Sequence, residues 1–587
     1  MTASTAKKRS ETDPGRSSSV QVAHKIIELR EQRDAAANKL GPLYSLSPVT
    51  CRALAARSFE PGEALENYLE THPATAAKKG LPTPETLGGL EKGVQLLKES
   101  IAHGEKIAIA NDFDVDGLTG GVQIYRALRQ AGLKPRLFVP HRFNEGYGLN
   151  TRIVDEALVE GCKLLITVDY GTTNTKEITY AQERGMKVIV IDHHAVKSAP
   201  PADAFINPQQ CGFAGGILCA SALAWYFISR ARRVVPELSN LNPWEFIPYA
   251  GIGTICDMVP LIGPNRVIAK STLALLKKSE HVGLRELLRV AGSEKYISCS
   301  TISFGIGPRI NAAGRMLDGT LVARLLTTED KKEASQLANE LDRLNQERQV
   351  TEEEARQIAL KKVFSRKKLE LGIMEADPDF HTGVVGLVAQ RLLDAFYLPT
   401  AILGFENGEY KGSIRGVRGF SVAEMISRIT DTGLLTKGGG HEAAGGWSFP
   451  KENYSAVEKA FYQECKRQLG GVRPSPVYLA DTYATIEETT PALVKELRLF
   501  EPFGMGNPGP TLLYEELQVK SIKLLKDAHL KVELSDGKKS IDGLMWRTTD
   551  HPHLYEGAHV RVAAKPGINE YRGTTKTQLD LQAVESA

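Results

Sequence analysis

Three short apolar segments, each followed at once by acidic residues, constrain the fold of this chain more than any other feature. Residues 107–110, 164–168 and 187–191 are almost entirely apolar, and stretches with helical spacing separate them. Short apolar segments of this kind are typical of strands that are buried on both faces of a parallel sheet. The sequence therefore predicts an α/β domain, which we assign to residues 105–320.

The acidic residues stand in corresponding positions, at the end of each predicted strand. They are, in chain order, Asp112, Asp114, Asp116, Asp169 and Asp192, the last followed by His193 and His194. The carboxyl ends of neighbouring parallel strands meet at the edge where such sheets bind ligands, so we expect these groups to converge. Because like charges at close range repel one another by several kcal/mol, the sequence predicts that divalent cations neutralise them.

The types of donor atom narrow the choice of metal. Carboxylates with one or two imidazoles and no sulfur favour Mn²⁺ or Mg²⁺ over a structural zinc ion. Two such ions about 4 Å apart, sharing a carboxylate, would activate a water and stabilise the leaving oxygen of a phosphoester. Asp116-Gly117 alone is more often a simple turn, but acidic motifs on three successive strands favour the metal site.

Composition excludes several other classes of protein. The chain has 587 residues, which corresponds to roughly four domains, and 42% hydrophobic with 24% charged residues excludes wholesale disorder. The 73 Lys and Arg nearly cancel the 70 Asp and Glu, so net charge alone does not indicate a nucleic-acid binder.

Seven scattered cysteines without a C-x-x-C pair support neither a disulfide framework nor a thiolate zinc site. The longest nearly apolar stretch, residues 216–228, is too short to cross a bilayer and no apolar signal is present, so we expect a cytoplasmic protein.

Changes in composition divide the rest of the chain. Residues 1–20, rich in Ser, Lys and Arg, are expected to form a disordered tail, and residues 21–104 a helical region. A connecting helix at residues 321–370, with apolar residues in 3-4-3 spacing, leads to a second α/β domain at residues 371–470. Residues 471–587 contain several short strands and predict a small closed β barrel.

At the acidic motifs the sequence resembles the DHH phosphoesterase superfamily, named for the triplet found here at residues 192–194, and within it the RecJ exonucleases. Further segments similar to that family follow in its order, at residues 141–148, 253–261, 307–315, 380–386, 412–415, 438–446 and 502–508. Two segments depart from the family pattern. The glycine-rich segment at residues 211–216 is a loose version, and Ser413-Ile414-Arg415 replaces the usual Ser-Ala-Arg. The resemblance implies a DHH core, a DHHA1 domain and a C-terminal OB-type barrel.

The resemblance also assigns roles in the metal site. It implies six metal ligands, with Asp169 as the bridge between ions: Asp112, Asp114, Asp116, Asp169, His193 and Asp257. His194 is expected near the scissile phosphate or behind the ligands, and Asp192 is expected to orient an imidazole. His141 and Arg142 occupy positions where the family holds substrate phosphate, although either residue alone would more often be a surface group. Asp257 alone would be read as a loop acid.

A second set of residues is expected to hold a terminal phosphate. Backbone amides of glycine-rich segments and an arginine bind phosphate oxygens well. By resemblance to DHHA1 domains, the pocket comprises Ser413, Arg415, Gly438, Gly439, Gly440 and His441, and it faces the metals across a cleft one strand wide. Arg309, Asn311 and Arg315 are candidates for the same task, although one of the two arginines could be structural instead.

The last domain supplies candidate contacts to a single strand. Barrels of the OB type bind unpaired nucleic acid through basic groups and stacked aromatic side chains. The candidates are Trp546, Tyr571 and Arg572, with Arg547, Lys526 and Lys531 beside them. Trp546 closes an apolar strand, so it could instead belong to the core of the barrel.

The resemblance implies a 5′-to-3′ exonuclease that degrades single-stranded DNA to 5′ mononucleotides with two Mn²⁺ or Mg²⁺ ions, in DNA repair and recombination. We expect a monomer with no membrane association, and a helicase and a single-strand-binding protein are candidate partners. Two alternatives stay open at this point. One is a phosphatase for short oligonucleotides or for small compounds such as 3′-phosphoadenosine 5′-phosphate or cyclic dinucleotides, although such relatives are much shorter. The other is a non-catalytic replication scaffold, although every expected ligand is present here.

Overall fold

The computed structural model describes residues 22–141, 145–210, 213, 215–292, 296–317, 319–571 and 574–587. The side chains of residues 571 and 574 are outside this description as well. Several predictions therefore concern residues outside the description, namely the tail at 1–20, Arg142, Arg572, the side chain of Tyr571 and residues 211, 212 and 214 of the glycine-rich segment. The chain divides into a larger unit, residues 29–346 and 480–581, and a smaller unit, residues 347–479 together with 22–28 and 582–586.

The larger unit contains the predicted parallel sheet. Its strand order is β3 (Arg136–Phe138), β2 (Lys106–Asn111), β4 (Cys162–Val168), β5 (Lys187–Ile191) and β6 (Ala204–Ile206), and every neighbouring pair is parallel. The last residue of β2 lies opposite the last residue of β4, which lies opposite the last residue of β5. The strands therefore end in line, and the acids that follow them reach the same edge.

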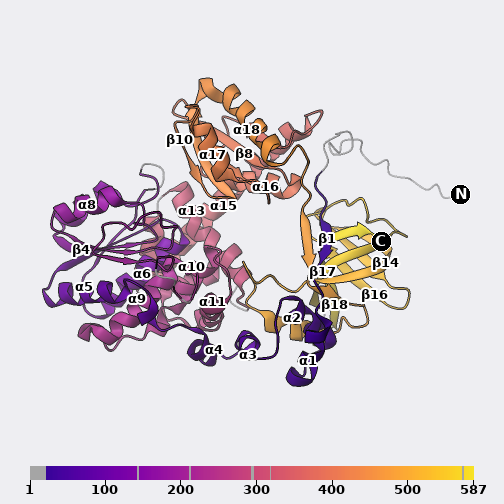
Figure 1. The fold of residues 1–587 in the computed structure, drawn as a ribbon, viewed down its shortest axis with the longest axis horizontal. Coiled ribbons are helices and arrows are strands. Elements are labelled where there is room, and N and C mark those ends of the chain that lie inside the picture. The colour runs from indigo at the N-terminus through magenta and orange to yellow at the C-terminus, as the bar shows by residue number, and fades with distance from the viewer. Residues whose placement is uncertain are drawn as a thin grey trace. The chain divides into compact units, whose positions relative to one another are not determined.

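Alternate side chains of these strands pack into two separate cores, as expected for a sheet covered on both faces. One core contains Ile109 and Ile166 with residues of α5 (Leu90–Ala102), α6 (Val115–Gln130) and α9 (Ala220–Val234). The other contains Leu165 and Val188 with residues of α7 (Thr151–Val159) and α8 (Thr175–Glu183). Figure 1 shows α5 and α9 on one side of the sheet and α8 on the other. The prediction of a buried parallel sheet is confirmed.

Further helices of the larger unit come before and after the sheet strands in the chain. The N-terminal ones are α1 (Asp34–Tyr44), α2 (Pro48–Ala56), α3 (Glu63–Leu69) and α4 (Pro73–Gly80). The later ones are α10 (Ile247–Cys256), α11 (Gly263–Leu275), α12 (Val282–Val290), a π-helical turn (Thr301–Ile306), α13 (Gly307–Met316), α14 (Thr320–Thr327) and α15 (Lys331–Phe364). The apolar face of α15 is buried at Ala334, Leu337, Leu341 and Leu344, in agreement with the 3-4-3 spacing.

The C-terminal barrel also belongs to the larger unit. Its strands are β14 (Leu512–Leu525), β15 (His529–Ser535), β16 (Ser540–Met545), β18 (Thr574–Ser586) and β17 (His559–Tyr571), in that spatial order. Because β14 also pairs with β17, the sheet closes on itself. A helix, α19 (Pro491–Leu497), precedes the barrel. The predicted closed barrel is confirmed.

The smaller unit is a second α/β domain with a largely antiparallel sheet. The strand order is β10 (Lys437–Gly440), β11 (Ala444–Pro450), β9 (Glu409–Arg415), β8 (Thr400–Glu406) and β7 (Ile373–Ala376), and only β7 and β8 run parallel. The helices α16 (Val385–Phe396), α17 (Val422–Thr430) and α18 (Tyr454–Gln468) pack with it. The glycine run at residues 438–440 is an exposed edge strand. A short ribbon pairs β1 (Ile26–Leu29) with β12 (Val477–Ala480).

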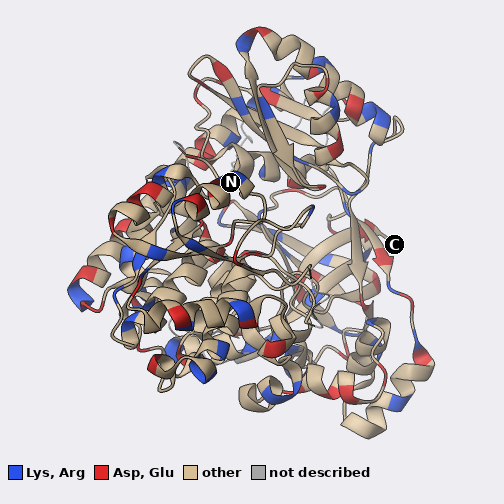
Figure 2. Cartoon of the chain, turned by 60° about the vertical axis from the view of Figure 1, so that its left-hand side comes forward, with Lys and Arg blue, Asp and Glu red and all other residues tan. Residues whose placement is uncertain are grey.

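Charge is distributed without a single dominant sign. Figure 2 shows basic and acidic positions intermixed along the helices and strands of the chain, which agrees with the nearly balanced totals in the sequence. Among the residues that the structure describes, no helix has the length and apolar character needed to cross a membrane.

Candidate metal centre

The first three acids lie on the tight connection from β2 to α6. Asp114 caps α6, because its carboxylate accepts a hydrogen bond from the backbone N–H of Gly117 at 3.0 Å. A Cβ at Gly117 would lie 2.7 Å from the backbone N and O of Asp112, so glycine is required for the chain to turn this closely. Asp112 and Asp116 are 3% and 1% exposed. The turn therefore buries two carboxylates and fixes a third beside them.

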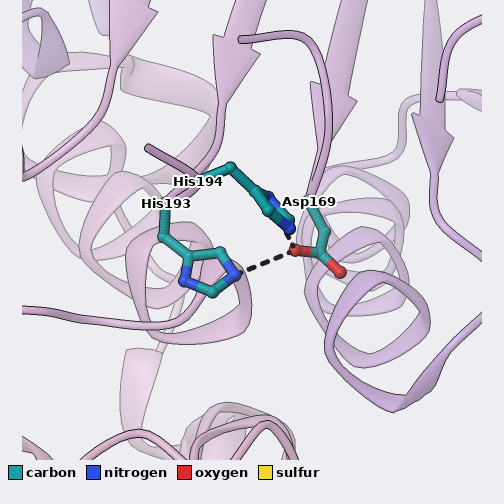
Figure 3. A group of neighbouring side chains, drawn as sticks. All are labelled: Asp169, His193 and His194. Carbon is teal, nitrogen blue, oxygen red and sulfur yellow. Dashed lines mark ion pairs between the residues drawn. The ribbon is translucent and has the colours of Figure 1, made fainter. Parts of the chain in front are cut away.

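Asp169 follows β4 in the left-handed backbone region, with a φ of 69°. Aspartate is one of the few residue types that tolerate this conformation. Its Oδ1 is buried and accepts no hydrogen bond from any residue that the structure describes, although the Nε2 of His193 lies 3.2 Å away and the Nδ1 of His194 4.0 Å away. Figure 3 shows both imidazoles pointing toward this carboxylate. A buried carboxylate oxygen without a donor is well suited to hold a cation.

His193 connects Asp169 to two further acids. Its Nε2 lies 3.6 Å from the Oδ2 of Asp257, at the end of α10, and 3.8 Å from the Oδ2 of Asp116. Three groups of possible ligand atoms result, each with all its atoms within 4.8 Å of one another: Asp112, Asp114 and Asp169; Asp116, His193 and Asp257; and Asp169, His193 and His194. The six side chains named by the resemblance are therefore brought together, and their oxygen-rich donor set fits Mn²⁺ or Mg²⁺.

Helix α9 holds Asp116 from behind. The backbone N–H groups of Ala220 and Ser221 donate to its two carboxylate oxygens at 2.7 and 2.9 Å. The amides at a helix N-terminus carry partial positive charge, so they stabilise this buried anion. This contact could not be predicted from the sequence, because no sequence pattern indicates which helix begins beside Asp116.

Asp192 orients His194. One of its oxygens lies 2.8 Å from the Nδ1 of His194 and accepts the backbone N–H of His193 at 2.7 Å, while the other accepts the N–H of Thr172 at 3.0 Å. Burial opposes ionisation of both side chains, yet these hydrogen bonds lower the pKa of Asp192 and raise the pKa of His194. His194 is thereby favoured as a cation, whereas burial lowers the pKa of His193 and favours its neutral, ligating form.

Tyr147 is a member of the site that the sequence analysis did not single out, although it lies in the family-like segment at residues 141–148. Its hydroxyl donates to the backbone carbonyl of Asp169 at 2.8 Å and lies 3.1 Å from the Nδ1 of His194. Its ring packs on His194 and against Tyr170, yet half of the side chain is exposed. Tyr147 therefore forms part of the solvent-facing wall of the cluster.

The electrostatics of the cluster require cations. Burial, and then repulsion from neighbouring acids, raises the pKa of Asp169 well above its usual value and raises the pKa of Asp257 to about 9. Burial also raises the pKa of Asp116. Without added positive charge these carboxyls cannot all be ionised near neutral pH, and divalent ions would reverse this. The residues present therefore fit a metal centre.

The other candidates in the larger unit differ in how they are placed. Arg309 is occupied, because its guanidinium pairs with Asp342 at 2.6 Å and donates to the carbonyls of Gly305 and Val290. Asn311 and Arg315 lie on α13, which approaches the metal loop where its Gly314 faces the backbone of Phe113. The backbone N–H of His141 donates to Glu145 at 2.7 Å.

The candidate contacts on the barrel differ in exposure and in pairing. Trp546 is 52% exposed and packs edge-on against His529, so the alternative that it belongs to the barrel core is wrong. Lys531 is paired with Asp542 at 2.8 Å, and Lys526 lies on the exposed turn between β14 and β15. Trp546 and Lys526 are therefore available to a ligand.

In the smaller unit, Arg415 and Ser413 lie close to the first turn of a helix. The Nη2 of Arg415 and the Oγ of Ser413 lie 3.0 and 3.1 Å from the position that a Cβ on Gly386 would occupy, in the first turn of α16. Burial lowers the pKa of Arg415, and no carboxylate among the described residues lies within 4.0 Å of its guanidinium. Gly438, Gly439, Gly440 and His441 lie in or next to β10, which is separated from β9 by β11. An uncompensated arginine beside a hydroxyl and a helix N-terminus is suited to bind a phosphate.

Comparison with known proteins agrees with this arrangement. Sequence models of the DHH family N-terminal domain, the DHHA1 domain and the RecJ OB domain match residues 106–246, 361–467 and 480–583. The curated single-stranded-DNA-specific exonuclease RecJ of Thermus thermophilus is 33% identical over 548 residues, which cover 91% of this chain and 76% of that protein.

Solved structures give the same result. The crystal structure of RecJ from Thermus thermophilus in complex with Mn²⁺ superposes with a TM-score of 0.82 at 28% identity, covering 96% of this chain and 80% of that one. The structure with Mg²⁺ gives a TM-score of 0.77 at 26% identity, covering 96% and 78%. With its DHH core, its DHHA1 domain and its OB barrel in the same order, this chain belongs to the RecJ family.

Proposed function

We propose that this chain is a 5′-to-3′ exonuclease that hydrolyses single-stranded DNA to 5′ mononucleotides with two divalent ions, in DNA repair and recombination. One observation carries the proposal. Two neighbouring groups of ligand atoms meet where the Oδ1 of Asp169 lies 3.2 Å from the Nε2 of His193. Paired metal sites that share a carboxylate are typical of enzymes that cleave phosphodiesters.

The ligands divide between the two ions. Asp112 and Asp114 would hold one, Asp116, His193 and Asp257 would hold the other, and Asp169, beside Asp112 and Asp114 and 3.2 Å from His193, would serve both. When bound, the ions supply a water of lowered pKa and positive charge for the leaving oxygen. The carboxylate of Asp116 keeps its orientation because two amides of α9 grip both of its oxygens.

His194 acts on the substrate phosphate. Its imidazole is kept in place by the 2.8 Å contact with Asp192 and by the hydroxyl of Tyr147, and its cationic form is favoured. A positive imidazolium beside the scissile group neutralises charge that develops on the phosphate oxygens. By resemblance, Arg142 has the same task; this residue lies outside the part of the chain that the structure describes.

A terminal phosphate gives the reaction its direction. The proposed pocket for a 5′ phosphate is formed by Ser413, Arg415 and the first turn of α16, with Gly438, Gly439, Gly440 and His441 contributing from β10 and the residue after it, two strands away in the same sheet. Its support is the partly buried Arg415 guanidinium, which donates to the carbonyl of Ile414 and whose pKa is lowered by burial. If the 5′ end must enter this pocket, only the phosphodiester nearest to that end is cut.

Arg315 and Asn311, on α13, are candidates for contact with the substrate near the metals. The guanidinium of Arg309 pairs with Asp342 and donates to two carbonyls, so it ties α13 to α15 and α12. The barrel adds affinity for the unpaired strand through the exposed ring of Trp546, with Arg547 and Lys526 beside it, and Tyr571 and Arg572 remain candidates by sequence. A helicase and a single-strand-binding protein are the proposed partners of a monomer.

The barrel also braces the metal centre. The segment after Asp257 donates the backbone N–H of Leu261 to the carbonyl of Met505 at 2.7 Å. Gly506, with a φ of 69°, approaches Pro260 so closely that a Cβ would lie 2.9 Å from its side chain. The loop before β14 therefore fixes the position of the segment that follows α10 and its metal ligand Asp257.

Asp169→Asn should abolish hydrolysis while strand binding in EDTA changes little. Asparagine keeps the volume and tolerates the left-handed backbone, so only the charge is lost, and we expect turnover to fall by about a thousandfold or more. Turnover is measured on end-labelled single strands with Mn²⁺ and, separately, with Mg²⁺. The exposed Asp155→Asn is the matched control, and turnover close to that of the control would contradict the assignment.

Arg415→Ala should weaken the use of 5′-phosphorylated strands more than that of 5′-hydroxyl strands. Losing a charge-assisted contact costs about 2–3 kcal/mol, which is roughly a 30- to 150-fold loss of kcat/KM on phosphorylated ends alone. Rates are compared on matched pairs of strands that differ only at the 5′ end. An equal loss on both kinds of end would remove the pocket from the proposal.

Trp546→Ala should weaken binding of single strands of about 40 nucleotides without altering cleavage of very short ones. Stacking of a base on an aromatic ring is worth about 1–3 kcal/mol, which predicts a roughly 5- to 150-fold higher Kd. Fluorescence anisotropy in EDTA measures the binding. Trp546→Phe should retain most of the affinity, and unchanged binding by the alanine variant would exclude this ring from the strand path.

Gly506→Ala should weaken Mn²⁺ binding, because its methyl group would displace Pro260 and with it Asp257. Changes just behind metal ligands typically cost about 10- to 100-fold in metal affinity. Gly537→Ala is the control, since Gly537 has a similar positive φ of 87° but open space around it. Affinity is measured by Mn²⁺ titration followed by electron paramagnetic resonance. Equal affinity of the two variants would show that the brace does not act on the metal centre.

A further inference from the structure

A cavity of about 520 Å³ lies in the larger unit, away from the acids of the metal centre. Four segments line it: Arg30 before α1, the N-terminal helices α2 to α4 with the turn after α2, the helix α11, and residues 506–508 before the barrel. Cavities that hold small organic ligands typically measure about 300–1,000 Å³ and have mostly apolar walls with a few polar groups. This cavity, called the junction cavity below, has that size and Ala56, Phe59 and Val267 among its apolar walls.

Two cations in its wall have no counter-charge. Arg266 is 5% exposed, and its terminal nitrogens donate only to backbone carbonyls, those of Tyr68, Leu499, Phe500 and Glu501. Lys270, one turn further along α11, donates to the carbonyl of Glu70. No carboxylate of the described residues lies within 4.0 Å of either charged group, and the carboxylate of Glu70 accepts from the backbone of His72 instead.

The other two cations of the wall share a single acid. Arg30 and Arg57 both pair with Asp481, at 3.0 and 2.9 Å. Four positive side chains therefore line the junction cavity, and Asp481 is the one carboxylate paired with any of them in the described part of the chain. Buried charges are normally paired, so this excess of positive charge indicates a missing anion.

Burial lowers the pKa of both unpaired cations, and a bound anion would raise it again. It lowers the pKa of Arg266 to about 10 and the pKa of Lys270 to about 8, with repulsion among the cations adding to the effect. Both groups still carry their protons at pH 7. An anion beside them would raise both pKa values again, and the same linkage means that protonated Lys270 favours anion binding.

Two polar atoms in the wall are left without partners. The Nε of Arg266 is a buried donor with no acceptor, and the Oδ1 of Asn67 is a buried acceptor with no donor, both among the described residues. A ligand that is an anion at one end and carries N–H or O–H groups at the other would satisfy both atoms. Phosphate alone would fill only a small part of 520 Å³, so the remainder of the ligand is an organic group.

We propose that the junction cavity binds a nucleoside monophosphate, with its phosphate on Lys270 and Arg266 and its sugar or base toward Asn67 and Phe59. The choice of a nucleotide, which would be the released product, rests on the function proposed above. The phosphate site itself rests only on the unpaired cations. A product held between α11, α3 and residues 506–508 would tie the barrel to the sheet domain, so we infer that product stabilises this junction.

The test is equilibrium binding of dAMP to the full chain in EDTA, where no turnover occurs, so failure of the nuclease proposal would not affect the result. The protein carries Arg415→Ala to silence the other proposed phosphate pocket. We expect dAMP to bind at one site and to raise the Tm. Lys270→Met, which keeps the length of the side chain, should weaken binding by about tenfold or more, whereas Lys270→Arg should retain it.

The controls separate charge from structure. Lys278→Met, at an exposed position just after α11, should bind dAMP as the parent does. Asn67→Asp places a carboxylate in the cavity, so it should abolish dAMP binding and raise the Tm of the free protein, which keeps the test valid if Lys270→Met fails to fold. Deoxyadenosine, which lacks phosphate, should not bind, and inorganic phosphate should bind more weakly than dAMP.

Three results would overturn the proposal. The first is dAMP binding that is equal in the parent, Lys270→Met and Asn67→Asp proteins, and the second is the absence of any dAMP binding. The third is a 5′-hydroxyl oligonucleotide that loses affinity with Lys270→Met while dAMP does not, since the cavity would then hold a backbone phosphate of the strand rather than a mononucleotide.

Discussion

Repulsion among buried carboxylates at one edge of a parallel sheet is the constraint on which the rest of this structure depends. Asp112, Asp116 and Asp169 are at most 3% exposed, and their ligand atoms lie within a few ångströms of one another. A fold that only needed stability would not gather these groups, because each buried charge without a partner is costly. Their arrangement is explained by cations that bind there.

The surrounding protein reduces this repulsion only in part. The N-terminus of α9 stabilises Asp116, and the imidazole of His194 stabilises Asp192. The Oδ1 of Asp169 receives no hydrogen bond from the described residues, so uncompensated negative charge remains on a residue that belongs both to the group with Asp112 and Asp114 and to the group with His193 and His194. In the smaller unit the imbalance is reversed, since Arg415 is partly buried and has no acid paired with it among the described residues. The substrate phosphates and metal ions of the proposed function would supply the charge that each of these sites lacks.

The sequence predicted those features that follow from local pattern. Apolar segments that run into acids identified the sheet and its ligand edge, because strand periodicity and the in-line ends of parallel strands are regular. It did not predict the contacts of α9 with Asp116, of Tyr147 with Asp169, or of Arg309 with Asp342. These contacts depend on the packing of segments that lie up to about a hundred residues apart in the chain. Residues of the same types at other positions are exposed, so residue type alone does not predict the contacts. The exposure of Trp546 could not be decided either, since an apolar strand end fits the core or the surface equally well.

The most direct measurement of the central claim is anomalous X-ray scattering from crystals of the full chain grown with Mn²⁺. The account predicts two manganese peaks about 4 Å apart, with the carboxylate of Asp169 between them and His193 on one of the two ions. A single peak, or peaks that lie away from Asp169, would contradict it.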